Sequence, residues 1–358
     1  MKILVLSNMY PSKESKTYGI FVKNQVEALK ERGHDVSVIA ITSIKKGKWA
    51  TLKKYLFFYF KQWLNILTTG KDYDVIHVHY VFPTGLFVPL FKKITKAKIV
   101  VTAHGGDIDQ MIHTHDFSRG RTEKILHIAD HIIAVGERLK TDMIHHFKIP
   151  ENKIQVSSMG VNLSVFHPVD KDEARHTVNM PANQKALVFV GNIIKKKGVL
   201  ELLCALSDQP SIHLYLIGET KDKRFYEDIK QQYLDQSAHF HYVGPVDQTE
   251  LKYWFSAADA FVLPSHIEGL GLVAVEAMAC QTPVIASDVG GLHYLLQDNT
   301  GILVTPEDSD ALKEAIVSFF NQNDHSLYIQ NGLERVKQHN AEKIIDDLLQ
   351  LYQDRKLV

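Results

Sequence analysis

The stretch at residues 260–279, AFVLPSHIEGLGLVAVEAMA, combines a strand, a glycine-containing loop and a helix start. The apolar run Ala260–Leu263 predicts a buried strand, and the apolar pattern after Gly271 predicts a helix. Gly269 and Gly271 allow the backbone of the connecting loop to come close to a ligand. The helix start near Leu270–Val273 offers free backbone N–H groups and the positive end of a helix dipole, which together suit a phosphate group.

Two carboxylates flank this helix start. Glu268 lies in the loop, and Glu276 lies further along the predicted helix. Because carboxylates repel phosphate, we expect both to accept hydrogen bonds from neutral hydroxyl groups, which sugars and riboses supply. The alternative is a purely structural helix start, with Glu268 as a favourable charge near its N-terminus. Glycine on both sides of Leu270 favours the ligand site.

A second loop adds positive charge to the same local pattern. Residues 190–198, VGNIIKKKG, follow a predicted strand and precede a predicted helix. Lys195, Lys196 and Lys197 at the carboxyl end of a parallel strand can neutralise a diphosphate. On its own this run favours a solvated surface loop. Together with the first loop it favours phosphate binding.

Short apolar runs alternate with helical patterns along the whole chain, which predicts an α/β fold with parallel sheets and crossover helices. The predicted strands of the first half are Lys2–Leu6, Val36–Ala40, Val75–Val78, Ile99–Thr102, Ile132–Val135 and Ile154–Ser157. Those of the second half are Leu187–Val190, Leu214–Ile217, Phe240–Val243, Ala260–Leu263, Pro283–Ala286 and Gly301–Val304.

The domain boundaries follow from a break in this alternation. Residues 166–184 contain Pro168, Pro181 and many charges but no strand, so they predict a linker between a domain at 1–165 and a domain at 185–335. The length of 358 residues fits two such domains. In the last segment, 336–358, a helix from Ala341 to Arg355 has an apolar stripe that docks either on its own domain or on the first.

Composition narrows the class of protein. Hydrophobic residues make up 45% of the chain, enough for two cores, and the 41 basic residues balance 41 acidic ones, which argues against a nucleic-acid partner. The two cysteines, Cys204 and Cys280, lie in apolar helical patterns, which favours buried thiols in a reducing compartment. The first apolar run is too short for a signal peptide, and no uncharged apolar stretch reaches ~18 residues. We therefore expect a cytoplasmic protein.

One segment is basic and aromatic without any acidic residue. Its members are Lys45, Lys46, Lys48, Trp49, Lys53, Lys54, Tyr55, Phe57, Phe58, Tyr59, Phe60, Lys61 and Trp63. Two interpretations stay open. The segment is either an amphipathic helix in peripheral contact with an anionic inner membrane face, or a core-facing helix whose lysines extend to solvent.

The spacing of Glu268 and Glu276, with seven residues between them, resembles the pattern of retaining glycosyltransferases of family 4, which have the GT-B fold. The resemblance covers nearly the whole chain, through the segments at 18–22, 32–36, 74–79, 102–107, 129–135, 216–219, 258–265 and 288–291. It implies two Rossmann-like domains facing each other across a cleft, and a nucleotide-sugar donor.

The resemblance also implies roles for the matching residues. Three would serve catalysis: Lys197 at the leaving diphosphate, Glu268 at the hydroxyls of the donor sugar, and His104 beside the transferred sugar. The others would bind the donor: Gly19 near the phosphates, Val243 near the base, the backbone of Leu270, Gly271 and Leu272 at sugar or phosphate, and Glu276 at the ribose. Asn192 would also be a donor-binding position. Family members usually have Arg there, and we expect Lys195 or Lys196 to compensate.

The sequence offers no nucleophile. By resemblance, the reaction is a front-face displacement in which the departing phosphate takes the proton of the acceptor. We expect no cofactor and no essential metal. The histidine groups His77/His79 and His113/His115/Asp116 lack a clear further ligand, and the two Asp-x-Asp pairs, Asp72/Asp74 and Asp107/Asp109, match a metal pattern that GT-B enzymes do not generally need.

Two other functions remain open at this point. A nucleotide-sugar epimerase can share the fold, but no histidine and carboxylate set for proton abstraction can be assigned. A non-catalytic nucleotide-sugar-binding protein is the other. A dehydrogenase is disfavoured because no Gly-x-Gly-x-x-Gly follows the first strand. The first half resembles bacterial enzymes that build cell-surface polysaccharides, including teichuronic-acid-type transferases, so the expected acceptor is a glycan or a lipid-linked glycan.

Overall fold

The chain folds into two compact α/β units. The computed structural model describes residues 1–13, 15, 18–45, 47–112 and 117–354. The first unit contains Met1–Met159 and Glu342–Val358, and the second contains Gly160–Ala341. None of the helices in these described ranges is long and apolar enough to cross a membrane.

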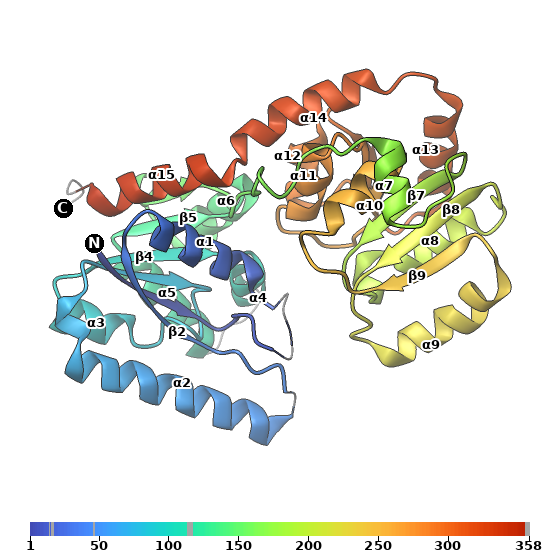
Figure 1. Cartoon of the computed structure of the whole chain (residues 1–358). Helices are drawn as coiled ribbons and strands as arrows, with labels where there is room; N and C mark the ends of the chain where they lie inside the picture. The colour runs from blue at the N-terminus through green and yellow to red at the C-terminus, as the bar shows by residue number, and fades with distance from the viewer. Residues whose placement is uncertain (14, 16–17, 46, 113–116, 355–358) are drawn as a thin grey trace. The chain divides into compact units, whose positions relative to one another are not determined.

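A parallel six-stranded sheet forms the middle of the first unit, in the order β2-β1-β3-β4-β5-β6 (Figure 1). Its strands are β1 (Lys2–Ser7), β2 (Asp35–Ala40), β3 (Val75–His79), β4 (Lys98–Ala103), β5 (His131–Ala134) and β6 (Ile154–Val156). Its helices are α1 (Ile20–Glu31), α2 (Lys48–Thr68), α3 (Val88–Ile94), α4 (Gly106–Ile112), α5 (Phe117–Ile128), α6 (Glu137–Phe147) and α15 (Ala341–Gln353). Two short 3-10 turns, Gly70–Asp72 and Glu151–Lys153, complete it.

Helices cover both faces of this sheet because alternate strand residues point to opposite sides. Ile3 and Val5 of β1 belong to one apolar cluster, together with α1 and α15. Leu4 and Leu6 belong to the other, together with residues of α2, α3, α4, α5 and α6. Burial on both faces explains why the strands read as continuous apolar runs in the sequence.

The C-terminal helix α15 is part of the first unit, which resolves the two alternatives left by the sequence. Its residues Ile345, Leu348 and Tyr352 are buried in the same cluster as Ile3 and Val5. Arg32, at the end of α1, also forms an ion pair with Asp346 at 3.2 Å. The chain therefore crosses from the first unit to the second and returns, and residues 355–358 at its end lie outside the described residues.

The second unit has a parallel sheet of the same size, in the order β12-β11-β10-β7-β8-β9. Its strands are β7 (Lys185–Val190), β8 (Ile212–Ile217), β9 (Phe240–Gly244), β10 (Ala260–Leu263), β11 (Val284–Ser287) and β12 (Ile302–Val304). Its helices are α7 (Lys171–Thr177), α8 (Val199–Leu206), α9 (Lys223–Gln232), α10 (Leu251–Ala257), α11 (Leu272–Ala279), α12 (Gly290–Leu296), α13 (Ser309–Asn321) and α14 (Ser326–Gln338). Short 3-10 turns occur at Lys195–Lys197 and Leu234–Gln236.

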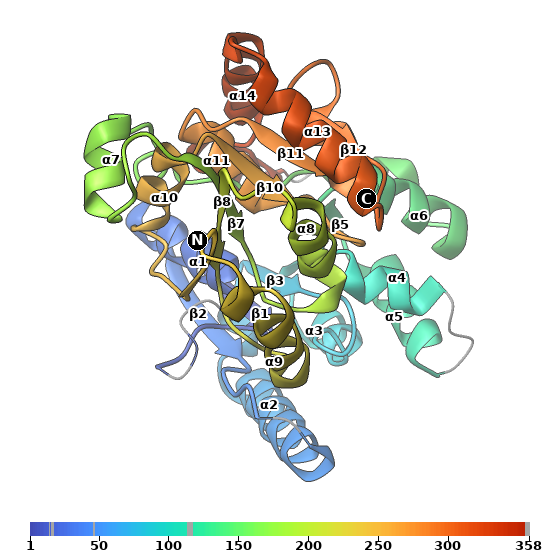
Figure 2. The ribbon, with the colours of Figure 1, turned by 90° about the vertical axis from the view of Figure 1, so that its right-hand side faces the viewer.

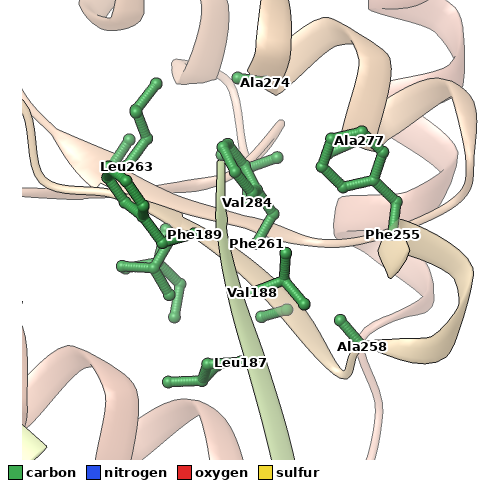
Figure 3. Close-up of a cluster of buried hydrophobic side chains, with 14 of the residues drawn as sticks. Leu187, Val188, Phe189, Phe255, Ala258, Phe261, Leu263, Ala274, Ala277 and Val284 are labelled. Atoms are coloured by element: carbon green, nitrogen blue, oxygen red, sulfur yellow. The ribbon is translucent and has the colours of Figure 1, made fainter. Parts of the chain in front are cut away.

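The core of the second unit is densely apolar around its two central strands (Figure 3). Phe189 of β7, Phe261 of β10 and Phe255 of α10 are fully buried, and the rings of Phe255 and Phe261 meet edge to face at 5.5 Å. Ala274 and Ala277 of α11 lie against the same cluster. Small residues on this helix let it approach the sheet closely.

All twelve predicted strands are present, but the predicted domain boundaries need correction. The first unit ends at Met159 rather than at residue 165, and residues 166–184 do not form a linker. Phe166 and Ala174 are buried in the core of the second unit. Arg175 is also buried, and it donates hydrogen bonds to the backbone oxygens of Ala257 and Gln184. The prolines and charges of this segment suggested a linker, but its buried residues pack against parts of the second unit that are distant in the sequence.

We expect the Leu348→Ala substitution to destabilise the protein by about 2–5 kcal/mol, because it removes a side chain that α15 buries against the sheet of the first unit. The measurement is urea unfolding followed by circular dichroism. Gln350→Ala, on the exposed side of the same helix, is the control and should unfold like the unchanged protein. Equal stability of the two variants would contradict the packing of α15.

Candidate functional site

The two loops singled out by the sequence follow neighbouring strands of the second unit. The chain runs from β7 to β8 and β9 on one side, and β10, β11 and β12 lie on the other side. Strand order therefore reverses between β7 and β10. In open parallel sheets, ligands bind outside the carboxyl ends of the strands at such a point. The lysine loop follows β7, and the Glu268 loop follows β10.

Lys197 and Glu268 form an ion pair across these loops. The distance between Lys197 Nζ and Glu268 Oε2 is 2.6 Å, and the hydroxyl of Ser265 donates to the same carboxylate oxygen at 3.2 Å. Both charged side chains are largely buried, with 23% and 16% of their surface exposed. A charge-assisted hydrogen bond in such surroundings fixes both groups in position.

Backbone contacts hold the two loops against each other. The N–H group of His266 donates to the carbonyl of Lys196 at 3.0 Å. Gly198 has a φ of +68°, and a Cβ atom at this position would overlap the carbonyl oxygen of Pro264. A further contact joins the Glu268 loop to α8, where His266 Nε2 lies within hydrogen-bonding distance, 3.0 Å, of Glu201 Oε1. The lysine loop therefore owes its position to the absence of a side chain at residue 198.

Helix α11 begins at the Glu268 loop with an open N-terminus. Its N-cap residue is Gly271, with a φ of +79°, and no side chain accepts a hydrogen bond from the first turn at this residue. Ala274 N–H donates to Gly271 O at 2.8 Å, whereas the N–H groups of Leu272 and Val273, at the very start of the helix, are the ones placed to bind an anion. The loop itself is fixed from α12, where Gly291 N–H donates to Gly269 O at 2.6 Å.

Glu276 lies on α11, one turn beyond this N-terminus. Gln248 Nε2 donates to its Oε1 at 3.2 Å. Burial raises the pKa of Glu276 to about 7, against the smaller lowering effect of the Gln248 hydrogen bond. The carboxyl group therefore changes protonation state near neutral pH, and hydroxyl donors from a ligand would stabilise its charged form.

Of the other donor-binding residues predicted in the second unit, three lie at the lysine loop or the start of α11, and Val243 lies on a different strand. Leu270 and Leu272 flank the N-cap glycine between the two carboxylates, so their place at the helix start is confirmed. Asn192 lies in the loop directly after β7, close in the chain to Lys197. Val243 lies on the edge strand β9, two strands away from β7. No hydrogen bond in the described part of the chain joins Val243 to the lysine loop.

The predicted residues of the first unit also follow strand ends. Gly19 is the N-cap of α1 and has a φ of +72°; a Cβ atom there would lie 2.5 Å from the carbonyl oxygen of Met9. His104 comes directly after β4. Its ring stacks on Tyr80 at a centroid distance of 4.4 Å and lies 5.0 Å from the ring of Phe21. The histidine therefore contacts two aromatic rings, one from the residue that follows β3 and one from α1.

A buried carboxylate, which sequence analysis treated only as part of a metal pattern, fixes the backbone around His104. Asp107 Oδ1 accepts the backbone N–H of His104 at 3.0 Å, and Oδ2 accepts that of Val81 at 2.8 Å. Burial raises the pKa of Asp107 to about 6. The signal for this role was its place three residues after His104, which is typical of a carboxylate that caps a turn.

His104 is a neutral ring with a defined hydrogen-bond partner. Burial, reinforced by the neighbouring His79, holds the pKa of His104 well below its usual range. His104 Nε2 lies 3.2 Å from His79 Nδ1, while His79 Nε2 is buried without a partner among the described residues. A buried N–H group without an acceptor costs more free energy than a buried ring nitrogen without a donor. We therefore leave His79 Nε2 unprotonated and assign the proton to Nδ1. His104 then accepts at Nε2 and carries its own proton on Nδ1.

The histidines considered as metal ligands have other partners. His77 bonds the hydroxyl groups of Tyr352 and Thr102 at 2.6 and 2.7 Å, and Asp74 accepts the backbone N–H of Lys2 at 2.7 Å. Within the described ranges, no group of three or more potential ligands could hold a metal ion. His113, His115 and Asp116 lie outside the described residues. Cys280 is a free, buried thiol whose pKa burial raises to about 12.

Family models also divide the chain into two parts, with the division between residues 165 and 170, a few residues after the boundary between Met159 and Gly160 that the fold defines. Residues 19–165 match the family model "Glycosyltransferase Family 4", and residues 170–336 match "Glycosyl transferases group 1". The chain is similar to a protein of Bacillus subtilis strain 168 assigned to teichuronic acid biosynthesis as a glycosyltransferase, with 28% identity over 89% of each chain. It is 33% identical to a D-inositol 3-phosphate glycosyltransferase of Streptosporangium roseum, over 66% of this chain and 59% of that protein.

Solved structures show the same fold over nearly the whole chain. A sucrose-phosphate synthase from Thermosynechococcus elongatus superposes with a TM-score of 0.81 and 26% identity, over 99% of this chain and 98% of the other. HepE of Anabaena in complex with UDP superposes with a TM-score of 0.79 and 18% identity, over 98% and 99%. Two Rossmann-like units of this kind define the GT-B class. The two glycosyltransferase models together cover most of the chain, which is therefore a glycosyltransferase, an enzyme that transfers glycosyl groups.

The raised pKa of Glu276 gives a prediction for stability. In the unfolded chain its pKa is about 4.3, so between about pH 4.3 and 7 the folded state binds more protons and loses stability as the pH rises. Glu276→Gln removes this loss and can keep the Gln248 contact. We expect the variant to gain roughly 1–3 kcal/mol relative to the unchanged protein between about pH 5 and 8.

The measurement is urea unfolding of both proteins across this pH range. Glu227→Gln makes the same change on the exposed surface of α9 and serves as the control. A constant difference between Glu276→Gln and the unchanged protein at all pH values would show that Glu276 titrates normally.

Proposed function

We propose that this chain is a retaining glycosyltransferase that moves a sugar from a nucleoside-diphosphate donor, a UDP-sugar in the first instance, to a hydroxyl of a glycan or lipid-linked glycan. The observation that carries the proposal is the Lys197–Glu268 ion pair at the open N-terminus of α11, with Glu276 beyond it. A cation, free N–H groups and two carboxylates at one strand switch point match the parts of a nucleotide sugar.

In this proposal the negatively charged diphosphate of the donor binds to the positively charged groups of the site. Lys197 and the first N–H groups of α11, beside Leu270, Gly271 and Leu272, bind the diphosphate. The Lys197 ammonium has three N–H donors, so it can contact a phosphate oxygen without leaving Glu268. Lys195 and Lys196, which are exposed in the same loop, add positive charge near Asn192.

The carboxylates meet the hydroxyl groups of the donor. Glu268 accepts hydrogen bonds from the transferred sugar, and Glu276 accepts them from the ribose. A buried carboxylate costs stability in the free protein, and neutral donors from the ligand offset part of that cost. In this proposal Val243, near the end of the edge strand β9, contacts the base.

The chemical step needs positioning and charge stabilisation rather than a protein nucleophile. The bond between the sugar's anomeric carbon and the phosphate oxygen breaks, and a bond to the acceptor oxygen forms on the same face. The acceptor's proton passes to the departing phosphate. Lys197 and the helix N-terminus stabilise the negative charge that develops on the leaving group. Neutral His104, with its proton on Nδ1, contributes a hydrogen bond to the transferred sugar, and Gly19 keeps its loop open to the phosphates.

Two relatives support the donor and the acceptor class separately. HepE has been crystallised with UDP and with UDP-glucose. The Bacillus subtilis relative is assigned to teichuronic acid biosynthesis, which favours a glycan acceptor of the cell surface. The same family matches favour a transferase over an epimerase or a non-catalytic binding protein.

Substituting Lys197 tests the proposal. A thermal-shift screen of UDP-, GDP- and ADP-sugars identifies the donor, and release of free nucleoside diphosphate from that donor in the presence of trial acceptors measures turnover. We expect Lys197→Ala to lower turnover by ~100-fold or more, because it removes a charge from the leaving group's site. Lys230→Ala is the control, since it removes a lysine that is ion-paired with Asp235 at the surface. Near-normal turnover in Lys197→Ala would refute the role of this lysine.

The pH dependence of donor binding tests Glu276 separately. Because ribose hydroxyls bind the deprotonated carboxylate, we expect affinity for UDP-glucose to rise about tenfold between about pH 6 and pH 8. The diphosphate of UDP-glucose stays fully ionised over this range, so its own titration does not interfere. Calorimetry in the presence of a chelator measures the affinity and tests the expected independence from metal. An equal rise with pH in Glu276→Gln would rule out Glu276 as the titrating group.

A further inference from the structure

Helix α2 docks on the first unit through a narrow inner face. Phe58, Gln62 and Ile66, at intervals of four residues, are its buried positions. Gln62 Nε2 donates to the carbonyl of Thr84 at 3.4 Å, and the hydroxyl of Tyr59 donates to that of Pro83 at 3.0 Å. These contacts seat the helix and leave the rest of its circumference unused by the fold.

The outer side of α2 is an exposed apolar stripe. Its members are Trp49, Leu52, Leu56, Phe60, Trp63 and Leu67. They recur every three or four residues and therefore share one side of the helix over about 27 Å. Their exposed fractions run from 47% for Trp63 to 84% for Trp49. Single exposed apolar residues are ordinary, whereas a continuous row of this length marks an interaction surface.

The surroundings of α2 leave this stripe uncovered by its own unit. In both views (Figures 1 and 2) α2 forms an outer edge of the first unit, and no other helix from the described residues of that unit lies beyond it. The sequence left open a core-facing helix with lysines extended to solvent. The structure has such a core-facing side in Phe58, Gln62 and Ile66, but four of the seven aromatic residues of α2, namely Trp49, Phe57, Phe60 and Trp63, are exposed.

Positive charge borders the stripe. Lys53 and Lys61 lie on the flank where Phe57 and Leu64 are also exposed, and Lys61 Nζ sits 4.6 Å from the centre of the Phe57 ring. Between Val36 and Lys71 the sequence has no aspartate and no glutamate. Lys46, in the same basic segment, lies outside the described residues. The partner of this surface must therefore combine apolar contact with negative charge.

We propose that α2 binds the interfacial layer of an anionic lipid bilayer, with the stripe inserted among the acyl chains and the lysines at the headgroups. A bilayer surface supplies both features along a straight line, and Trp, Phe and Leu opposite Lys are the residues that lie stably in it. Each lysine near an anionic surface adds about 1 kcal/mol. A second copy of α2 is disfavoured because it would bring lysines against lysines with no acidic residue between them.

This surface contains none of the residues proposed for donor binding, so its test does not depend on transferase activity. For a lipid-linked acceptor, docking through α2 would hold the first unit at the surface where the acceptor resides.

The experiment is co-sedimentation of the full chain with vesicles of phosphatidylcholine alone or of phosphatidylcholine and phosphatidylglycerol in equal parts. Tryptophan fluorescence adds a direct readout, because two of the three tryptophans, Trp49 and Trp63, lie in the stripe and Trp254 is buried. We expect binding to the anionic vesicles with a blue-shifted emission, weakened by salt. No binding to anionic vesicles would overturn the proposal.

Two sets of substitutions separate the apolar from the charged contribution. Trp49→Ser, Leu56→Ser and Trp63→Ser together should weaken binding by ~tenfold or more, as should Lys53→Glu, Lys54→Glu and Lys61→Glu together. The controls are Leu327→Ser, at an exposed apolar residue of α14, and the same three-charge reversal at the exposed residues Lys93, Lys96 and Lys124.

Every substituted residue is at least partly exposed, so thermal unfolding should stay unchanged in all variants. Equal loss of binding in test and control variants would overturn the assignment to α2. Self-association of the unchanged protein that the serine variant abolishes, without vesicle binding, would show that the stripe pairs with a second copy and not with a bilayer.

Discussion

The adjacency of β7 and β10 is the constraint on which the proposed site depends. Because strand order reverses between them, the loops that follow both strands emerge at the same edge of the sheet. The close backbone contact at Gly198 and the His266–Lys196 hydrogen bond then hold the loops together. The 2.6 Å contact between Lys197 and Glu268 is a consequence of that arrangement, and so is the position of the α11 N-terminus beside it.

Both units hold titratable groups, in the loops and helices that follow strands, whose pKa values burial has shifted. His104 is kept neutral, and the pKa values of Asp107 and Glu276 are raised to about 6 and 7. Each shift toward the neutral form costs the folded protein stability at the pH where the charged form would otherwise prevail. Natural proteins accept such costs mainly at functional sites, which is why the shifts support the proposed roles.

The elements of the fold could be predicted because each rests on local pattern. Strands buried on both faces read as apolar runs, and all twelve were found in this way. The segment 166–184 shows where local sequence patterns mislead. Its prolines and charges are typical of a linker, yet Arg175 is buried, and the backbone carbonyl of Ala257, which is 82 residues away in the sequence, accepts its Nε–H. The helix α2 was ambiguous for the same reason, since periodicity defines two faces without saying which one meets the core.

The sequence by itself determined the strands, the helix starts and the two loops rich in glycine and charge, because these depend on neighbours within a few residues. Only the tertiary structure decided which groups meet. Glu268 is 71 residues from Lys197, and Tyr352 is 275 residues from the His77 ring that it bonds. Contacts at such separations follow from strand order, crossover direction and the packing of helices on a sheet, and none of these is encoded at any single position.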